Sequence, residues 1–153
     1  MSTLSDEQAL RRLAAYCSRS ERCIEEVCRK MNLWEIPADS QNRIVQQLLQ
    51  EKFLDEERYC KAFVNDKAKY NRWGIGKIRF ELRKKQIPEP VIREALKNLD
   101  PEESRERLRL LIEQKKKSIK GKNDYDIRQK LLRFAASRGF SQEEIESVLR
   151  TDD

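Results

Sequence analysis

Apolar residues recur every three or four positions along most of the chain, the spacing that places them on one face of an α-helix. In the first such stretch, Leu10, Leu13 and Cys17 share a face, and Ser5 with Gln8 forms a capping box before them. Prolines, glycines and capping residues interrupt this pattern at short intervals. The hydrophobic pattern therefore predicts an all-α protein made of short helices.

The predicted helices fall into three groups of three. In the middle group, Asp55 starts the first helix, residues 73–76 (Trp-Gly-Ile-Gly) separate it from the second, and Pro88 opens the third. Asp100 followed by Pro101 starts the last group equally clearly. We therefore predict an elongated array of three tandem three-helix repeats. Their predicted limits are 1–52, 53–99 and 100–153.

Apolar positions repeat between the groups at nearly constant offsets. The predicted offsets are 49 for the first helices, 54 between the second helices of the first two groups, and 53 between the last two groups. In the first group, Ser18 with Glu21 is expected to cap the second helix. A three-helix unit of about 50 residues buries little surface alone, so neighbouring units are expected to complete each other's cores.

The net charge of +6 is concentrated in the middle of the chain. Residues 1–58 contain nine basic and eleven acidic residues, and residues 100–153 contain thirteen and twelve. Residues 59–99 contain eleven basic residues against four acidic ones. Such a field attracts a polyanion such as nucleic acid or an acidic protein surface, although a solvated lysine-rich helix face is the alternative.

The candidate binding surface is the second helix of the middle unit together with the segment before it. If Ile75, Ile78 and Leu82 face inward, the basic residues of this helix point outward in two rows, with Lys77 above Lys84 and Arg79 beside Arg83. The lysines after the seventh predicted helix either extend this surface or belong to a disordered linker. The candidate residues are Lys67, Lys69, Arg72, Lys77, Arg79, Arg83, Lys84, Lys85, Lys115, Lys116 and Lys117.

Two aromatic residues, Tyr70 and Trp73, flank this basic run. They either stack on nucleic-acid bases or pack against the local core. No motif that reads bases is recognisable, and phosphate contacts position a protein without specifying sequence. The surface is therefore interpreted as one that binds without sequence preference.

The sequence offers little for catalysis. It has no histidine, no phosphate loop and no nucleophile elbow, and Gly74-x-Gly76 lacks the third glycine of a dinucleotide site. Asp124 and Asp126, or the acids at 55–57, are candidate Mg²⁺ ligands for a nuclease, but acids at helix starts have a simpler role as caps. We interpret the chain as a binding protein without a cofactor or metal, not as an enzyme.

The remaining features concern cysteines and location. Cys17, Cys23, Cys28 and Cys60 form no CxxC pair, so they are interpreted as buried free thiols rather than a zinc site. No apolar stretch is long enough to span a bilayer, and the N-terminus lacks the apolar region of a signal peptide. A cytoplasmic protein that does not bind membranes is therefore expected.

The middle unit resembles a known family. The runs F-L-D-E-E-R-Y-x-x-x-F-V at 53–64 and W-G-x-G-K-I-R-x-E-L-R-x-K-x-I at 73–87 are similar to the signature of RecX regulatory proteins, small bacterial modulators of the recombinase RecA. The run K-x-x-R-F-x-x-x-R-G-F at 130–140 resembles the C-terminal repeat of that family. Over residues 1–50 the resemblance is faint. Gln86 stands where the family commonly has glycine, which leaves the end of this helix uncertain.

The resemblance implies three tandem three-helix repeats that bind in the groove of the RecA filament on single-stranded DNA. It implies inhibition of the recombinase, ATPase and coprotease activities of RecA, within DNA repair and the SOS response, by a protein that is not an enzyme. Lys77, Arg79, Arg83 and Lys84 are then expected to face the filament, and the protein is expected to be a monomer. A general nucleic-acid-binding helical protein and a helical scaffold for an acidic protein stay open as alternatives.

Overall fold

The computed structural model describes residues 4–151, in which every regular element is an α-helix. The predicted all-α fold of tandem three-helix repeats is confirmed. The first unit contains α1 (Asp6–Arg19), α2 (Ile24–Leu33) and α3 (Ala38–Gln50). The second contains α4 (Glu56–Lys69), α5 (Ile75–Lys84) and α6 (Glu89–Leu96). The third contains α7 (Pro101–Lys116), α8 (Asp124–Ser137) and α9 (Gln142–Thr151).

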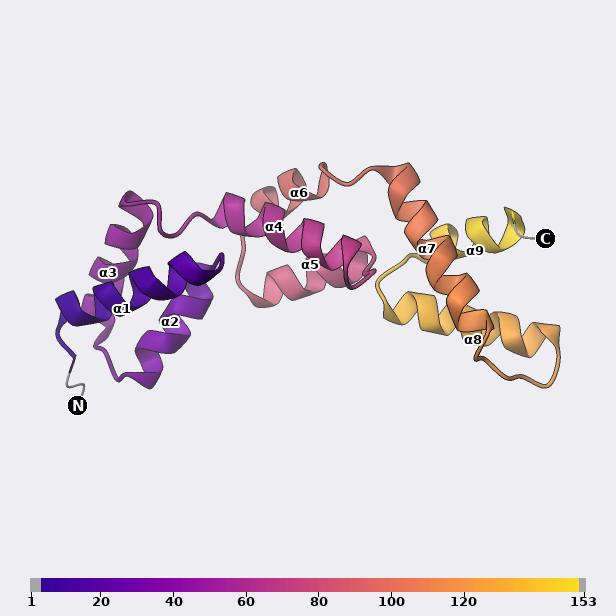
Figure 1. Cartoon of the computed structure of the whole chain (residues 1–153), viewed down its shortest axis with the longest axis horizontal. Helices are drawn as coiled ribbons and strands as arrows, with labels where there is room; N and C mark the ends of the chain where they lie inside the picture. The colour runs from indigo at the N-terminus through magenta and orange to yellow at the C-terminus, as the bar shows by residue number, and fades with distance from the viewer. Residues whose placement is uncertain (1–3, 152–153) are drawn as a thin grey trace.

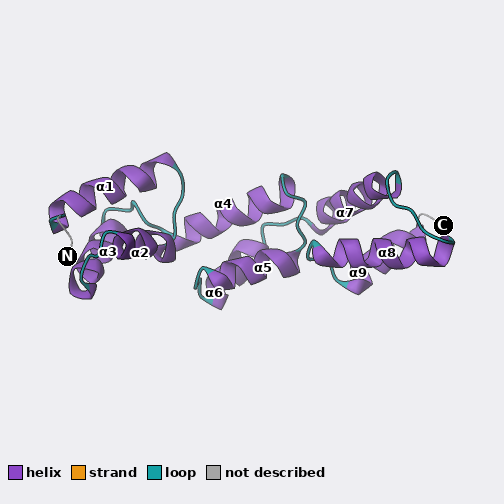
Figure 2. Cartoon of the chain, turned by 90° about the horizontal axis from the view of Figure 1, so that it is seen from below, coloured by secondary structure: helices purple, strands orange, loops and turns teal. Residues whose placement is uncertain are grey.

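The three units follow one another in line, so the molecule is elongated (Figure 1). A view turned by 90° shows the same succession from the N-terminal to the C-terminal unit (Figure 2). The described residues contain no buried polar or charged residue, and their buried side chains are apolar. The domain limits themselves stay a prediction.

Each unit has its own hydrophobic core, and the prediction that neighbours complete one another's cores is wrong. The three clusters centre on Leu13, Ile78 and Leu131, and extensive helix contacts occur within a unit. Exchange between clusters occurs at the joint of the first two units, where Cys23, before α2, belongs to the second cluster and Leu54, before α4, belongs to the first. Three helices crossing one another enclose their apolar faces by themselves, so the joints between units carry little buried apolar surface.

The start of α1 agrees with the sequence, whereas the start of α2 does not. The Ser5 hydroxyl accepts a hydrogen bond from the Gln8 N–H at 3.1 Å, as the capping box requires. Ser18 lies inside α1 and donates to the Ala14 carbonyl at 2.8 Å, so the prediction that it caps α2 is wrong. The residue that precedes α2 is Cys23. Helix α1 ends one residue after Ser18, at Arg19, and its last buried residue is Cys17.

Gln86 ends α5 in a left-handed conformation, with φ of 61°. Its N–H donates to the Arg83 carbonyl at 2.9 Å, and the Ile87 N–H donates to the Leu82 carbonyl at 3.2 Å. These two bonds define a Schellman cap. A glycine adopts this conformation without steric cost, which explains why glycine is common here in the family that the sequence resembles.

The same cap ends the second helix of every unit, with Glu35 (φ 57°) and Gly139 (φ 100°) in the place of Gln86. The caps are separated by 51 and 53 residues, so the predicted offset of 53 is confirmed and that of 54 is wrong. The burial of side chains also supports an offset of 51 residues, because Val27 and Ile78, which are 51 residues apart, are both fully buried. The offset of 54 instead aligns Ile24 and Cys28, which are only half-buried, and Leu33, which is exposed.

Candidate basic interface

Trp73 lies where α4 leads into α5 and joins the core to the basic surface. Its N–H donates to the Lys67 carbonyl at 3.0 Å, and its ring meets Phe63 edge-on with centroids 6.4 Å apart. The ammonium groups of Lys67 and Lys77 lie 5.0 and 4.6 Å from the centroid of the Trp73 ring. Trp73 therefore packs on the core rim, as predicted, and holds two cations beside the same ring.

Helix α5 presents a second aromatic residue, Phe80, which the sequence analysis missed. Its side chain is 60% exposed, and it lies three residues after Lys77 and four before Lys84, on one helical stripe. The Lys84 ammonium is 5.5 Å from the ring centroid and 3.6 Å from the Glu81 carboxylate. The sequence could have indicated this residue, because Phe80 does not lie on the helical stripe of Ile78 and Leu82 that is expected to be buried. A phenylalanine outside that stripe does not contribute to the core.

The inward stripe of α5 is shorter than predicted. Ile78 and Leu82 are fully buried, but Ile75 is 40% exposed, so its predicted inward position is wrong. Ile75 is the first residue of α5, after the N-cap Gly74, and lies beyond the core of its own unit. It lines the crevice toward the third unit instead.

Arg79 and Arg83 do not form the unopposed outward row that the sequence predicted. Both form ion pairs with Glu89, and Arg83 Nε lies 3.3 Å from Glu89 Oε2. Glu89 begins α6. Since α6 returns beside α5, this carboxylate comes to lie between the two arginines and neutralises part of their charge.

Lys85 faces the first unit rather than solvent. Its ammonium lies 3.7 Å from a Glu26 carboxylate oxygen and 4.0 Å from one of Glu25, both on α2. A second ion pair, Arg58 with Glu21 at 2.6 Å, spans the same two units. Lys85 therefore belongs to an ionic joint between units, because the end of α5 lies against the start of α2.

The other basic candidates of the second unit lie at the end of α4 and in the loop that leads to α5. Arg72 donates from Nη1 to the Gln114 Oε1 atom on α7 at 2.9 Å, and Lys69 lies beside the exposed Tyr70 with its ammonium 5.4 Å from the ring centroid. Lys67 and Lys77 lie beside the Trp73 ring, and Lys69 lies beside the Tyr70 ring. Over residues 4–151, no carboxylate lies within ion-pairing distance of these three lysines.

The lysines of the third unit begin within α7, so the prediction that Lys115 and Lys116 follow this helix is wrong. Lys115 and Lys116 form the last turn of α7, where cations stabilise the negative end of the helix dipole, and Lys117 is its C-cap. The Lys115 ammonium lies 4.7 Å from the Phe134 ring centroid. Arg72 reaches α7 next to Lys115, through Gln114, so the two basic segments are linked at this point.

The acids considered as metal ligands act as helix caps or pair with lysine. Asp55 accepts from the Arg58 N–H at 3.0 Å, and Asp126 accepts from the Lys122 N–H at 3.0 Å and pairs with Lys130. The Lys122 N–H hydrogen bond, with a smaller contribution from Lys130, holds the pKa of Asp126 below its usual range. Within the described residues, no three His, Cys, Asp or Glu side chains come close enough together to hold a metal ion.

The cysteines are free thiols. Cys17, Cys23 and Cys60 are buried, as predicted, whereas Cys28 is half-buried. Burial raises the pKa of Cys23 to about 12 and that of Cys60 to about 11. Among helices of the described chain, none combines the length and apolarity needed to cross a membrane.

Comparisons with family models and with curated proteins all match the chain to RecX proteins. Residues 55–96 match the model of the second three-helix domain of RecX, and residues 102–149 match that of the third. A regulatory protein RecX of Clostridium botulinum (strain Eklund 17B / Type B) is 33% identical over 134 residues, which are 86% of this chain and 62% of the relative. One of Clostridium tetani is 36% identical over 110 residues, 70% of this chain and 50% of the relative. The chain thus spans from half to under two thirds of the length of these relatives.

Solved structures show the same fold. A crystal structure of regulatory protein RecX superposes with a TM-score of 0.89 at 24% identity, covering 97% of this chain and 73% of that one. The crystal structure of RecX from Lactobacillus salivarius gives 0.82 at 20% identity, covering 95% of both chains.

Proposed function

Because the chain belongs to the RecX family of regulatory proteins, we propose that it binds the RecA filament on single-stranded DNA and mainly inhibits its recombinase, ATPase and coprotease activities. This would place it in DNA repair and the SOS response, as a cytoplasmic monomer that acts by binding rather than by catalysis. The relatives are themselves named regulatory proteins.

The observation that carries this proposal is the unneutralised lysine cluster, in which Lys67 and Lys77 lie beside Trp73 and Lys69 lies beside Tyr70. Each ammonium lies beside an aromatic ring, so its position is fixed without a carboxylate that would cancel its charge. A fixed, unopposed cation is suited to a phosphate or to an acidic protein surface, and a filament on DNA offers both.

The length of the molecule supports the same partner. Three units in line form an extended body rather than a compact one (Figure 1). Extended repeat arrays bind extended partners along their length. An extended protein that contacts several neighbouring RecA protomers at once would resist movement of these protomers relative to one another. This gives a physical basis for inhibition of filament activities that require such movement.

The test is a titration of this protein into a RecA ATPase assay on single-stranded DNA. The unmodified protein should lower the rate at or below equal amounts, and Lys77→Glu should weaken this inhibition at least several-fold. Lys97→Glu is the matched control, because it makes the same charge change at an exposed lysine of the same unit that pairs with Glu94. This control should inhibit normally.

Three results would overturn the proposal. The first is no inhibition by the unmodified protein at equal amounts, and the second is normal inhibition by Lys77→Glu. The third is DNA retention with steep salt dependence to which RecA adds nothing, which would indicate a general nucleic-acid-binding protein. Salt-sensitive binding to an acidic protein without any effect on RecA would likewise point to the scaffold function.

A further inference from the structure

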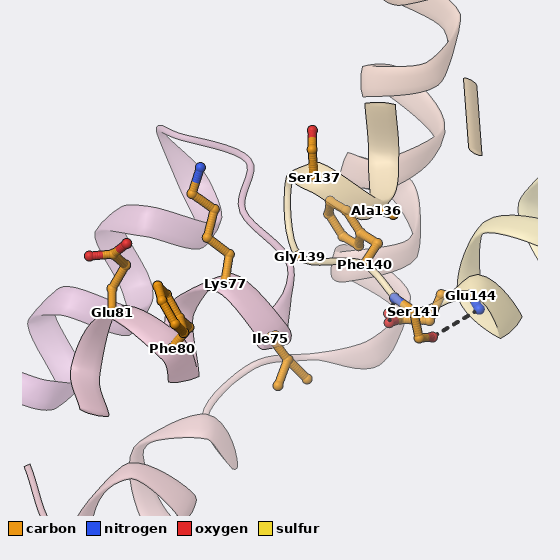
Figure 3. A pocket seen from close by; sticks show the side chains of 11 residues that line it. Ile75, Lys77, Phe80, Glu81, Ala136, Ser137, Gly139, Phe140, Ser141 and Glu144 are labelled. Carbon is orange, nitrogen blue, oxygen red and sulfur yellow. Dashed lines mark hydrogen bonds between the residues drawn. The ribbon is translucent and has the colours of Figure 1, made fainter. Parts of the chain in front are cut away.

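Beside the lysine cluster, an open groove of about 750 Å³ separates α5 from the turn between α8 and α9. Figure 3 shows Phe80 on the α5 side of this groove and Phe140 on the opposite side, with Ile75 near the junction of the two units. Phe80 is exposed because the core of its own unit lies on the other side of α5. An aromatic side chain held in this way offers a ring face to a ligand.

The cations lie on either side of Phe80 along α5. Lys77 precedes it by three residues and Lys84 follows it by four, so their attachment points are about 10 Å apart along the helix axis. The Lys84 ammonium lies 5.5 Å from the centroid of the Phe80 ring, and the Lys77 ammonium lies 4.6 Å from the centroid of the Trp73 ring. The ring therefore lies between two cationic positions.

Two carboxylates line the groove together with Lys77. Glu81 lines it from α5, and Glu144 lines it from α9, where Glu144 accepts a hydrogen bond from the Ser141 N–H at 2.9 Å. Carboxylates repel a phosphate but accept hydrogen bonds from a neutral amide or amino group. The two carboxylates thus suit an uncharged planar ring, and Lys77 and Lys84 suit the anion attached to that ring.

We propose that Phe80 stacks on an unpaired base of single-stranded nucleic acid, with Lys77 and Lys84 contacting the phosphates on either side of that base. The proposal rests on the proposed function and deepens it, since it assigns direct contact with the DNA strand to α5. Stacking on an aromatic ring is tolerant of sequence, because every base has a π-face. This agrees with the lack of a base-reading motif.

The experiment measures binding of fluorescent oligo(dT) and of an abasic oligonucleotide of equal length, without RecA, over a range of salt concentrations. Phe80→Ala should weaken oligo(dT) binding about five-fold or more and leave both abasic binding and the salt dependence unchanged. Phe80→Trp should restore the affinity. Leu33→Ala is the control, because it removes another exposed apolar side chain, from α2. Thermal unfolding of each variant verifies that the fold is intact.

The base-stacking proposal is overturned if the unmodified protein binds no oligonucleotide at low salt, if Phe80→Ala binds oligo(dT) normally, or if it loses abasic binding equally. Should Phe80→Ala bind DNA normally but lose its inhibition of RecA, Phe80 contacts protein and the proposed function survives alone. Loss of oligo(dT) affinity in a protein that never inhibits RecA supports stacking and overturns the proposed function.

Discussion

The N–H of Gly76 donates a hydrogen bond to the carbonyl oxygen of Gly139 at 3.0 Å, across the joint between the second and third units. Beside it, the Gly74 N–H donates to the Arg138 carbonyl at 2.7 Å. The N-terminal N–H groups of α5 thus satisfy carbonyls at the end of α8, groups that neither helix can pair internally. Two backbones meet directly here, whereas the joint between the first and second units is made through side chains, among them two ion pairs and a hydrogen bond from the Ile24 N–H to Glu56.

Replacing Gly74 with alanine should open this joint. The added Cβ would lie 2.5 Å from the Gly139 carbonyl carbon and oxygen, which are backbone atoms that cannot rotate away. We expect a loss of about 1–3 kcal/mol from overpacking, together with a changed overall length. Chemical denaturation and small-angle X-ray scattering measure the two effects.

Gly76→Ala is the graded comparison, because its Cβ would lie 3.0 Å from the Gly139 oxygen. It should be the milder variant. Equal stability and equal scattering of the Gly74→Ala variant and the unmodified protein would show that the glycines do not set the spacing of these units.

Replacing Gln86 with glycine should stabilise the second unit. Gln86 is held at φ 61°, and glycine removes that steric cost while adding some unfolded-state entropy. A net gain of roughly 0.5–1 kcal/mol in the free energy of unfolding is expected, measured by chemical denaturation. Gln86→Ala keeps a Cβ and should bring no such gain. An equal gain from alanine would refute the conformational explanation.

Replacing Glu89 with glutamine should strengthen binding to the filament and to oligonucleotides. The change releases Arg79 and Arg83 from their shared carboxylate, so both become available to phosphate. The affinity should rise several-fold and its salt dependence should steepen, as fluorescence titration at several salt concentrations would show. Glu94→Gln makes the same charge change on α6 next to Lys97 and should have a smaller effect. Equal effects of the two variants would mean that net charge alone is responsible.

Replacing Glu56 with glutamine should stabilise the protein in a pH-dependent way. Burial raises the pKa of the Glu56 carboxyl, and a hydrogen bond from the Ile24 N–H offsets part of this shift. As pH rises, the unfolded chain releases the proton first, so ionised Glu56 lowers stability above the ordinary glutamate pKa of about 4.3. Glutamine retains an acceptor for Ile24 and avoids the charge.

The Glu56→Gln variant should therefore unfold at a higher temperature than the unmodified protein at pH 7, and the difference should disappear below about pH 4. Thermal unfolding at both pH values measures it. Glu57→Gln, an exposed neighbour in the same helical turn, is the control and should show no such gain. A gain at pH 7 that persists unchanged at pH 3.5 would contradict the assignment to Glu56 ionisation.

The amino-acid sequence by itself determined the helices, their grouping in threes and the concentration of basic residues in the middle unit. These features depend on neighbours within one or two turns, such as the Ser5 capping box, or on composition summed over a segment. Gln86 left the end of α5 open in the sequence, and its left-handed conformation became visible only in the structure.

Only the tertiary structure decided which basic residues remain unneutralised and which exposed ring lies beside them. Glu89 reaches Arg79 because α6 returns alongside α5, and Lys85 meets Glu26 because α5 ends against the first unit. Phe80 stays exposed because it lines the open groove between α5 and the turn from α8 to α9. Such pairings depend on the path of the chain between elements far apart in sequence, and helical spacing within one element does not contain that path.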